Sequence, residues 1–306
     1  MSLALLCSGQ GHQNREMFDL VTVLPQARPI LDSASIALGA DPADFCRTAP
    51  EPALHANREG QILCVTRALA IAAALFPTGA PPETFVAGYS VGEVAACGLA
   101  SIWSTNETLM ITERRARAMD AASGSNDQLC YLRGLSRPAV ERLAGRFDCA
   151  LAIVNPGLLF IVGGLRSSID AFCAAALEDG AAKAAPMPIY VASHTPRLAA
   201  AVAPFLDALA AVAPKPPSLR LVSATGPALV TNPSIVLNGL ARQLTDTIDW
   251  AAVLEILAER GVTQILEFGP GHALAEMAAA TLPWAKVRAV DDFRSIEGIR
   301  QWLGTQ

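Results

Sequence analysis

The 306-residue chain has few charged residues, few aromatic residues and no long run of lysine or arginine. Its formal net charge is -5, and only 17% of the residues are charged and 6% aromatic. Because binding to nucleic-acid phosphates requires a basic surface, this balance argues against a nucleic-acid-binding protein. The 52% of apolar residues instead predicts a compact globular protein with a sizeable core.

Long apolar runs are also missing. The longest stretches, such as residues 68–76, are much shorter than the roughly 20 residues that cross a bilayer. No positively charged segment precedes the apolar residues 3–7, so we expect a buried strand there rather than a signal peptide. We therefore expect a cytoplasmic protein with no membrane partner.

The seven cysteines are scattered and show no C-x-x-C spacing. An odd number without this spacing predicts neither a disulfide framework nor a zinc site. We expect the cysteines to be small core residues in a reducing compartment, and we expect no metal.

Short apolar segments alternate with amphipathic helical stretches along most of the chain, which is typical of a mostly parallel α/β sheet. Between residues 125 and 190 the order changes to strand, helix, strand, strand, helix, strand, which is typical of a ferredoxin-like domain. We predict a large α/β-hydrolase-like domain from residues 1–124 and 191–306, with a small ferredoxin-like domain, residues 125–190, inserted in it. The main strands of the large domain are expected at residues 3–7, 84–87, 219–222 and 264–268.

A serine lies between two glycines in the segment Gly88-Tyr89-Ser90-Val91-Gly92, after an apolar strand and before a helical stretch. Such a strand-to-helix turn, a nucleophile elbow, exposes the serine at the N-terminus of a helix. The glycines avoid side-chain collisions, and the helix N-terminus brings backbone N–H groups to the serine. The segment predicts Ser90 as a nucleophile and the Val91 N–H as an oxyanion donor, with an ordinary Gly-Ser turn as the alternative.

Only four histidines are present, so a general base can be sought by elimination. His55 lies in a polar stretch, His12 lies in a glycine-rich loop, and His272 is expected to cap a helix. His194 follows the strand that returns to the large domain, and we predict that it removes the Ser90 proton. No acidic residue in a suitable place completes a hydrolase triad, so a main-chain or amide oxygen is expected to orient His194.

The motifs of the chain, and the order in which they occur, resemble those of the malonyl-CoA:acyl carrier protein transacylase family along essentially the whole chain. The segment Gly9-Gln10-Gly11-His12-Gln13 resembles the family's GQGxQ loop, residues 88–93 resemble GHSxGE, and residues 267–271 resemble the late xGPG turn. The resemblance implies that the Gln10 N–H joins that of Val91 in the oxyanion hole. It also implies that Gln61 is a supporting residue.

Arg115 matches the arginine of the family's RGxxM motif, and a planar guanidinium can hold the free carboxylate of a malonyl group with two parallel hydrogen bonds. Arg117 lies two residues further along the predicted helix, about 200° away, so only one of the two can face a pocket. We expect Arg114 and Arg117 to be solvated. His194 matches the catalytic histidine, and Gln243 matches the glutamine around which a carbonyl orients that histidine.

The chain also departs from the family pattern. Ser8 stands in place of the usual proline, Tyr89 in place of histidine, Ala116 in place of glycine, and Leu159 in place of glutamine. Ser8, Tyr89 and the alanine-rich segment 115–120 resemble the acyltransferase (epsilon) subunit of malonate decarboxylase.

The resemblance implies a function in which Ser90 accepts a malonyl group from malonyl-CoA and passes it to the phosphopantetheine-type thiol of a carrier protein. No tightly bound cofactor is expected. The expected acceptor is the carrier subunit of malonate decarboxylase, and the alternative is an acyl carrier protein of fatty-acid or polyketide synthesis. A serine thioesterase or hydrolase and a non-catalytic carrier-binding subunit remain as further alternatives. Arg133, Arg166 and Lys183 are candidates for carrier docking.

Overall fold

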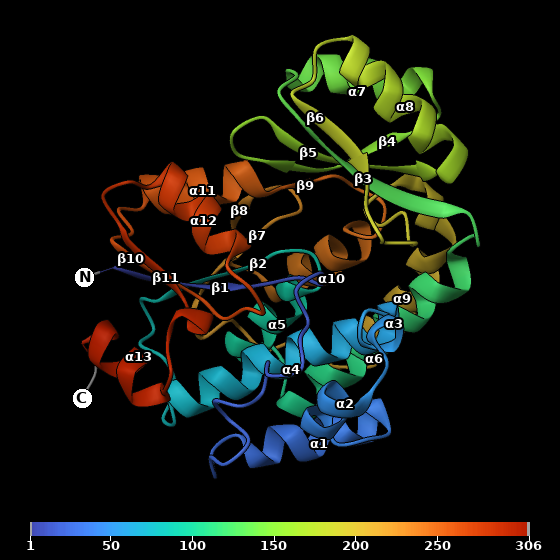
Figure 1. Ribbon diagram of the computed structural model, residues 1–306. Coiled ribbons are helices and arrows are strands. Elements are labelled where there is room, and N and C mark those ends of the chain that lie inside the picture. Colours follow the sequence, from blue (N-terminus) through green and yellow to red (C-terminus); the bar gives the residue numbers. More distant parts are fainter. Residues whose placement is uncertain (1, 305–306) are drawn as a thin grey trace.

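The computed structural model describes residues 2–304, which form a large body and a smaller one above it (Figure 1). The large body contains a six-stranded sheet, here called the large sheet, of order β11-β10-β1-β2-β7-β8. All its strand pairs are parallel except β7 with β8. The strands are β1 (Leu3–Cys7), β2 (Phe85–Gly88), β7 (Arg220–Ser223), β8 (Ala228–Leu229), β10 (Gln264–Glu267) and β11 (Lys286–Ala289).

Helices cover both faces of the large sheet because successive side chains of its strands point in opposite directions. In β1, Leu5 and Cys7 join a core with α1, α4, α5, α6 and α9, whereas Ala4 and Leu6 join a core with α11 and α12. Figure 1 shows these two helical layers on opposite sides of the sheet. The helices of the large body are α1 (Arg28–Leu38), α2 (Pro42–Thr48), α3 (Glu51–Leu54), α4 (Asn57–Leu75), α5 (Gly92–Leu99), α6 (Thr105–Ala122), α9 (Ala199–Ala210), α10 (Pro233–Arg242), α11 (Trp250–Glu259), α12 (Ala273–Thr281) and α13 (Ile296–Leu303), with short 3-10 helices at Pro196–Leu198 and Val290–Asp292.

The smaller body contains a five-stranded sheet, here called the small sheet, of order β6-β3-β5-β4-β9. Its outer face is covered by α7 and α8 (Figure 1). The inner face shares a core with the large sheet, because Leu129, Ala152 and Ile161 cluster with Leu6 and Trp250. The elements are β3 (Asp127–Arg133), α7 (Arg137–Arg146), β4 (Ala150–Asn155), β5 (Leu159–Leu165), α8 (Arg166–Glu178), β6 (Lys183–Pro186) and β9 (Ile248–Asp249).

The predicted α/β fold class is confirmed, and β3 to β6 follow the predicted strand and helix order. One strand of the small sheet was not predicted. β9 comes from residues outside 125–190 and pairs in parallel with β4. The domain boundaries themselves stay a prediction.

All seven cysteines are unpaired, and six of them are buried, as expected for small core residues. Within residues 2–304, no helix is both long enough and apolar enough to cross a membrane.

Candidate active site

Ser90 lies in the sharp turn between β2 and α5, and its φ of 55° falls in the left-handed region that residues other than glycine rarely adopt. The turn is very tight. A Cβ atom at Gly88 would lie 2.0 Å from the backbone of Gly92, and one at Gly92 would lie 2.1 Å from the carbonyl oxygen of Cys7. Both flanking positions therefore require glycine, which explains the sequence pattern around the serine.

The side chain of His194 lies against that of Ser90, with 2.8 Å between Nε2 and Oγ. On the other side of the ring, Nδ1 lies 2.5 Å from the backbone carbonyl oxygen of Gln243. A carbonyl only accepts hydrogen bonds, so Nδ1 carries the proton and Nε2 is the free acceptor for the serine hydroxyl. The backbone also holds the histidine in place, because its N–H donates to the Leu244 carbonyl at 2.9 Å.

Burial keeps His194 neutral. The side chain is 2% exposed, and this burial, together with the nearby positive charge of Arg115, lowers its pKa from 6.5 to about 3, although the bond to the Gln243 carbonyl acts in the opposite direction. A neutral imidazole with Nε2 facing a serine hydroxyl has the form that a general base requires.

The backbone N–H groups of Gln10 and Val91 remain the candidates for an oxyanion hole. Val91 directly precedes α5, and the loop of residues 9–13, here called the oxyanion loop, packs against the elbow. A Cβ atom at Gly9 would lie 2.9 Å from the Tyr89 carbonyl oxygen and 3.6 Å from Ser90 Cβ. Among the described residues, no acceptor is bonded to the N–H of Gln10 or of Val91. Both donors are therefore available to a ligand.

Arg115 is completely buried on α6, and its terminal nitrogens bond to two neutral amides. Nη1 donates to Gln61 Oε1 at 2.7 Å, and Nη2 donates to Gln243 Oε1 at 2.9 Å. Its Nε has no partner among residues 2–304. The neighbouring Arg114 and Arg117 side chains are 61% and 63% exposed, so only one of the three arginines faces the interior.

A buried carboxylate that the sequence analysis did not single out completes this network. Glu93 Oε2 accepts a hydrogen bond from Gln243 Nε2 at 2.6 Å, and Oε1 accepts one from the Ser223 hydroxyl at 2.6 Å. Gln243 thus connects Glu93 to Arg115 through its side chain and contacts His194 through its backbone. Glu93 follows Ser90 by three residues in the first turn of α5, and its place in the GHSxGE motif was the available signal.

The negative charge of Glu93 and the positive charge of Arg115 lie on opposite sides of the Gln243 side chain. Burial lowers the pKa of Arg115 from 12.5 to about 10, and the negative charge of Glu93 opposes this decrease. Burial likewise raises the pKa of Glu93, whereas its hydrogen bonds to Ser223, Ala224 and Gln243 and the charge of Arg115 lower it. Each charge reduces the cost of burying the other.

Gln61 and Tyr89 connect the site to its surroundings. Gln61 Nε2 donates to Asn57 Oδ1 at 2.8 Å, which leaves its Oε1 to face Arg115. Tyr89 packs edge-on against Trp250, with ring centroids 5.5 Å apart, and the side chain of Asn155, at the end of β4, interacts with its hydroxyl. Tyr89 therefore joins the nucleophile turn to the small sheet.

The other three histidines lie apart from the Ser90 hydroxyl. His55 pairs with Glu51, and His272 pairs with Asp292 at 3.1 Å. The expectation that His272 caps α12 was wrong in part, because it occupies the N-cap position but its side chain makes no capping hydrogen bond. His12 packs against the late glycine turn, since a Cβ atom at Gly271 would lie 2.8 Å from His12 Cβ.

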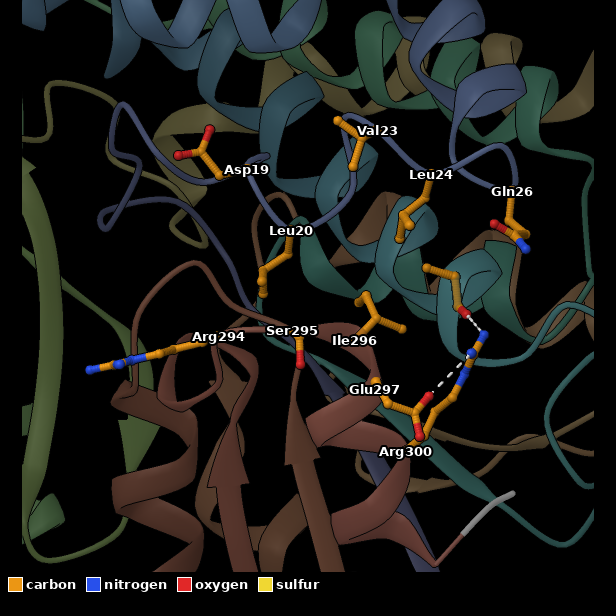
Figure 2. A pocket seen from close by; sticks show the side chains of 11 residues that line it. Asp19, Leu20, Val23, Leu24, Gln26, Arg294, Ser295, Ile296, Glu297 and Arg300 are labelled. Atoms are coloured by element: carbon orange, nitrogen blue, oxygen red, sulfur yellow. Dashed lines mark hydrogen bonds and ion pairs between the residues drawn. The ribbon is translucent and has the colours of Figure 1, made fainter.

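A surface hollow of ≈ 410 Å³ lies between residues 19–26 and 294–300 (Figure 2). Within it, Arg300 donates to the Ala74 carbonyl and pairs with Glu297. None of the predicted site residues lines this hollow.

The serine and the neutral histidine have the arrangement that serine-based acyl transfer requires, with two available N–H groups nearby. Residues 5–282 match the acyl transferase domain family, and the chain belongs to that family.

Individual members of the family that are similar to this chain are named as malonyl transferases. The chain is 25% identical over 278 residues to the malonyl CoA-acyl carrier protein transacylase of Escherichia coli K12, covering 89% of this chain and 90% of that protein. It is 28% identical over 294 residues to the protein of the same name from Mycobacterium tuberculosis H37Rv, covering 94% and 96%. The crystal structure of an acyl-carrier-protein S-malonyltransferase from Burkholderia pseudomallei matches with a TM-score of 0.92 at 26% identity, covering 98% of this chain and all of that one.

Proposed function

We propose that the chain is a malonyl-CoA:acyl carrier protein transacylase in which Ser90 is the nucleophile and His194 the general base. The observation that carries this proposal is the environment of Arg115, a completely buried cation whose terminal nitrogens, among residues 2–304, bond only to the side-chain oxygens of two neutral amides. A substrate carboxylate that replaces these amides gains two charge-assisted hydrogen bonds. Malonyl groups carry such a carboxylate at one end and the reacting thioester at the other.

The first half of the reaction loads the enzyme. His194 Nε2 takes the proton from Ser90 Oγ as the oxygen attacks the thioester carbonyl carbon, and the Gln10 and Val91 N–H groups hold the resulting oxyanion. When the intermediate collapses, the bond to sulfur breaks and His194 returns the proton to the departing coenzyme A thiolate. The product is a malonyl ester on Ser90.

The second half runs in the opposite direction with a different thiol. The phosphopantetheine-type thiol of the carrier gives its proton to His194, and its sulfur attacks the malonyl ester. The bond to Ser90 Oγ then breaks, and His194 returns the proton to that oxygen. These steps require no metal ion or redox cofactor. Because water could attack the same ester, the buried position of His194 favours transfer over hydrolysis.

The acceptor that we propose is an acyl carrier protein. The named relatives are malonyl CoA-acyl carrier protein transacylases, and a malonyl-transacylase in complex with the acyl-carrier protein of a type II polyketide synthase has the same fold, with a TM-score of 0.92. The malonate decarboxylase carrier has no support from these relatives. Ser8, Tyr89 and segment 115–120 remain the only features that favour it.

Carrier docking is proposed on the exposed basic residues Arg133, Arg166 and Lys183. Two of these cations stack on aromatic rings, Arg166 over Tyr190 at 5.4 Å and Lys183 over Tyr131 at 5.1 Å. Strands β3 and β6, which carry Arg133 and Lys183, pair at one edge of the small sheet. Positive charges here would attract an acidic carrier and make its association salt-sensitive.

The test is intact-mass spectrometry of the protein mixed with malonyl-CoA. We expect a malonyl adduct on the native chain that is absent from Ser90→Ala, with the same thermal unfolding in both. Release of the adduct to a holo acyl carrier protein supports the transferase, whereas release only as free malonate identifies a hydrolase. If the native chain forms no adduct and shows no turnover, it is a carrier-binding module instead.

A further inference from the structure

A second buried carboxylate is hydrogen-bonded to Ser8, the residue before the oxyanion loop, and takes no part in the steps above. Glu267 is the last residue of β10 and is completely buried. Its Oε1 accepts a hydrogen bond from the Ser8 hydroxyl at 2.7 Å, and its Oε2 accepts one from the Ala275 N–H at 2.7 Å in the first turn of α12. The carboxylate therefore joins the end of β1 to the start of α12.

Ser8 lies between β1 and the oxyanion loop, in direct contact with the nucleophile turn. A Cβ atom at Gly92 would lie 2.9 Å from the Ser8 carbonyl oxygen, so the two backbones touch. The following residue, Gly9, packs on the backbone of Tyr89. A displacement of Ser8 would move the Gln10 N–H, two residues further on, relative to Ser90.

We propose that Glu267 is a positioning residue for acyl transfer, which acts through the Ser8 hydroxyl to hold the Gln10 N–H at the distance from Ser90 that the oxyanion requires. This inference rests on the proposed function. It assigns Ser8, the departure from the usual proline, a role that proline cannot fill, because proline has no hydroxyl to donate. The effect is indirect, since Glu267 itself contacts neither Ser90 nor His194.

The strength of the Ser8 bond depends on the charge of Glu267. Burial raises the pKa of Glu267 from 4.5 to about 7, although its hydrogen bonds to Ser8, Ala275 and Leu274 and the nearby His272 lower it. Hydrogen bonds to an ionised acceptor are roughly twice as strong as neutral ones, so Ser8 is held most firmly above pH 7. Three other charged groups lie around this carboxylate. Burial lowers the pKa of Arg67, whereas the negative charge of Glu267 raises it. Asp291 pairs with Arg67, and Asp292 pairs with His272.

The experiment is single-turnover acylation of the chain by malonyl-CoA between pH 5.5 and 8.5. In the native chain, the acylation rate constant should rise roughly tenfold through pH 7, because small displacements of catalytic groups have effects of this size. Ser8→Ala and Glu267→Gln should both remain near the low-pH rate over the whole range. Ser8→Thr, which keeps the hydroxyl, should restore the rise. The control His272→Gln should retain the rise in rate near pH 7. This result would show that the rise comes from titration of Glu267 and not of His272.

The double variant Ser8→Ala/Glu267→Gln should be no slower than the slower of the two single variants, because both changes remove the same hydrogen bond between Ser8 and Glu267. A purely structural role would lower the melting temperature of the variants but leave the rise at pH 7 unchanged, and that result overturns the proposal. If Glu267→Gln does not fold, the comparison of Ser8→Ala with Ser8→Thr decides the question alone. If the native chain forms no acyl-enzyme, the proposed function fails first and this inference fails with it.

Discussion

Replacement of Arg115 by alanine tests the proposed specificity most directly. The change removes the donors to Gln61 Oε1 and Gln243 Oε1 and leaves Glu93 without the positive charge that offsets its burial. It also leaves the malonyl carboxylate without a partner. Loss of one member of a desolvated charge pair costs about 2 to 5 kcal/mol, so kcat/KM for malonyl-CoA should fall roughly 30- to 4,000-fold.

Acetyl-CoA provides the internal comparison because an acetyl group has no carboxylate. Acetyl transfer should fall much less than malonyl transfer, or even rise, since the site loses a charge that acetyl groups do not use. The assay follows acyl-enzyme formation from both thioesters on the same preparation. Arg114→Ala is the matched control, because this neighbouring side chain is 61% exposed and makes no contact with Gln61 or Gln243.

An equal loss for malonyl and acetyl transfer in Arg115→Ala would refute the reasoning. It would show that the guanidinium supports the geometry of Gln243 and His194 rather than the substrate. Thermal unfolding of Arg115→Ala and Arg114→Ala, measured alongside, separates loss of fold from loss of specificity.

Two further predictions concern the groups on either side of Gln243. Glu93→Gln removes the negative charge near Arg115 and places an amide donor against either Gln243 Nε2 or the Ala224 N–H. Malonyl acylation should then be roughly tenfold slower, since a mismatched buried donor costs 1 to 3 kcal/mol; an unchanged rate would show that the charge is not needed. His194 binds a proton in the unfolded chain below pH 6.5 but in the folded chain only below about pH 3, so its contribution to the unfolding free energy is lost as the pH falls between these values. Urea unfolding from pH 6.5 to 4 should therefore show a slope up to ~1.4 kcal/mol per pH unit steeper than in His194→Gln, and equal slopes would contradict the low pKa.

The nucleophile and base candidates could be identified from the sequence because their signals are local or rare. Ser90 lies between glycines whose positions require the absence of a side chain, and His194 is one of only four histidines. Arg115 could be singled out because it matches the RGxxM motif and because helical periodicity allows only one of Arg115 and Arg117 to face the interior. For these residues, geometry within a few positions of the chain fixes the side-chain direction.

Other parts of the site depend on contacts that leave no local pattern. Ser8 and Glu267 are 259 positions apart, and they meet only because β10 pairs with β1. Strand β9 has two residues, too few for any periodicity, and its place beside β4 comes from the packing of the small sheet. Strand β11 lies at the edge of the large sheet and is only partly buried, so it lacks the apolar run that marks the inner strands.

The position of β1 between β2 and β10 also constrains how the protein is made on the ribosome. Of the described strands, β1 is synthesised before all others, but the strand on one of its sides begins only at Gln264. A nascent chain can pair β1 with β2 early, whereas the other edge of β1 stays open until most of the chain has emerged. An open edge can pair with other chains, so this interval exposes the protein to misassembly. The same late strand carries the carboxylate that bonds to Ser8, so the oxyanion loop gains this support only after residue 267 has emerged.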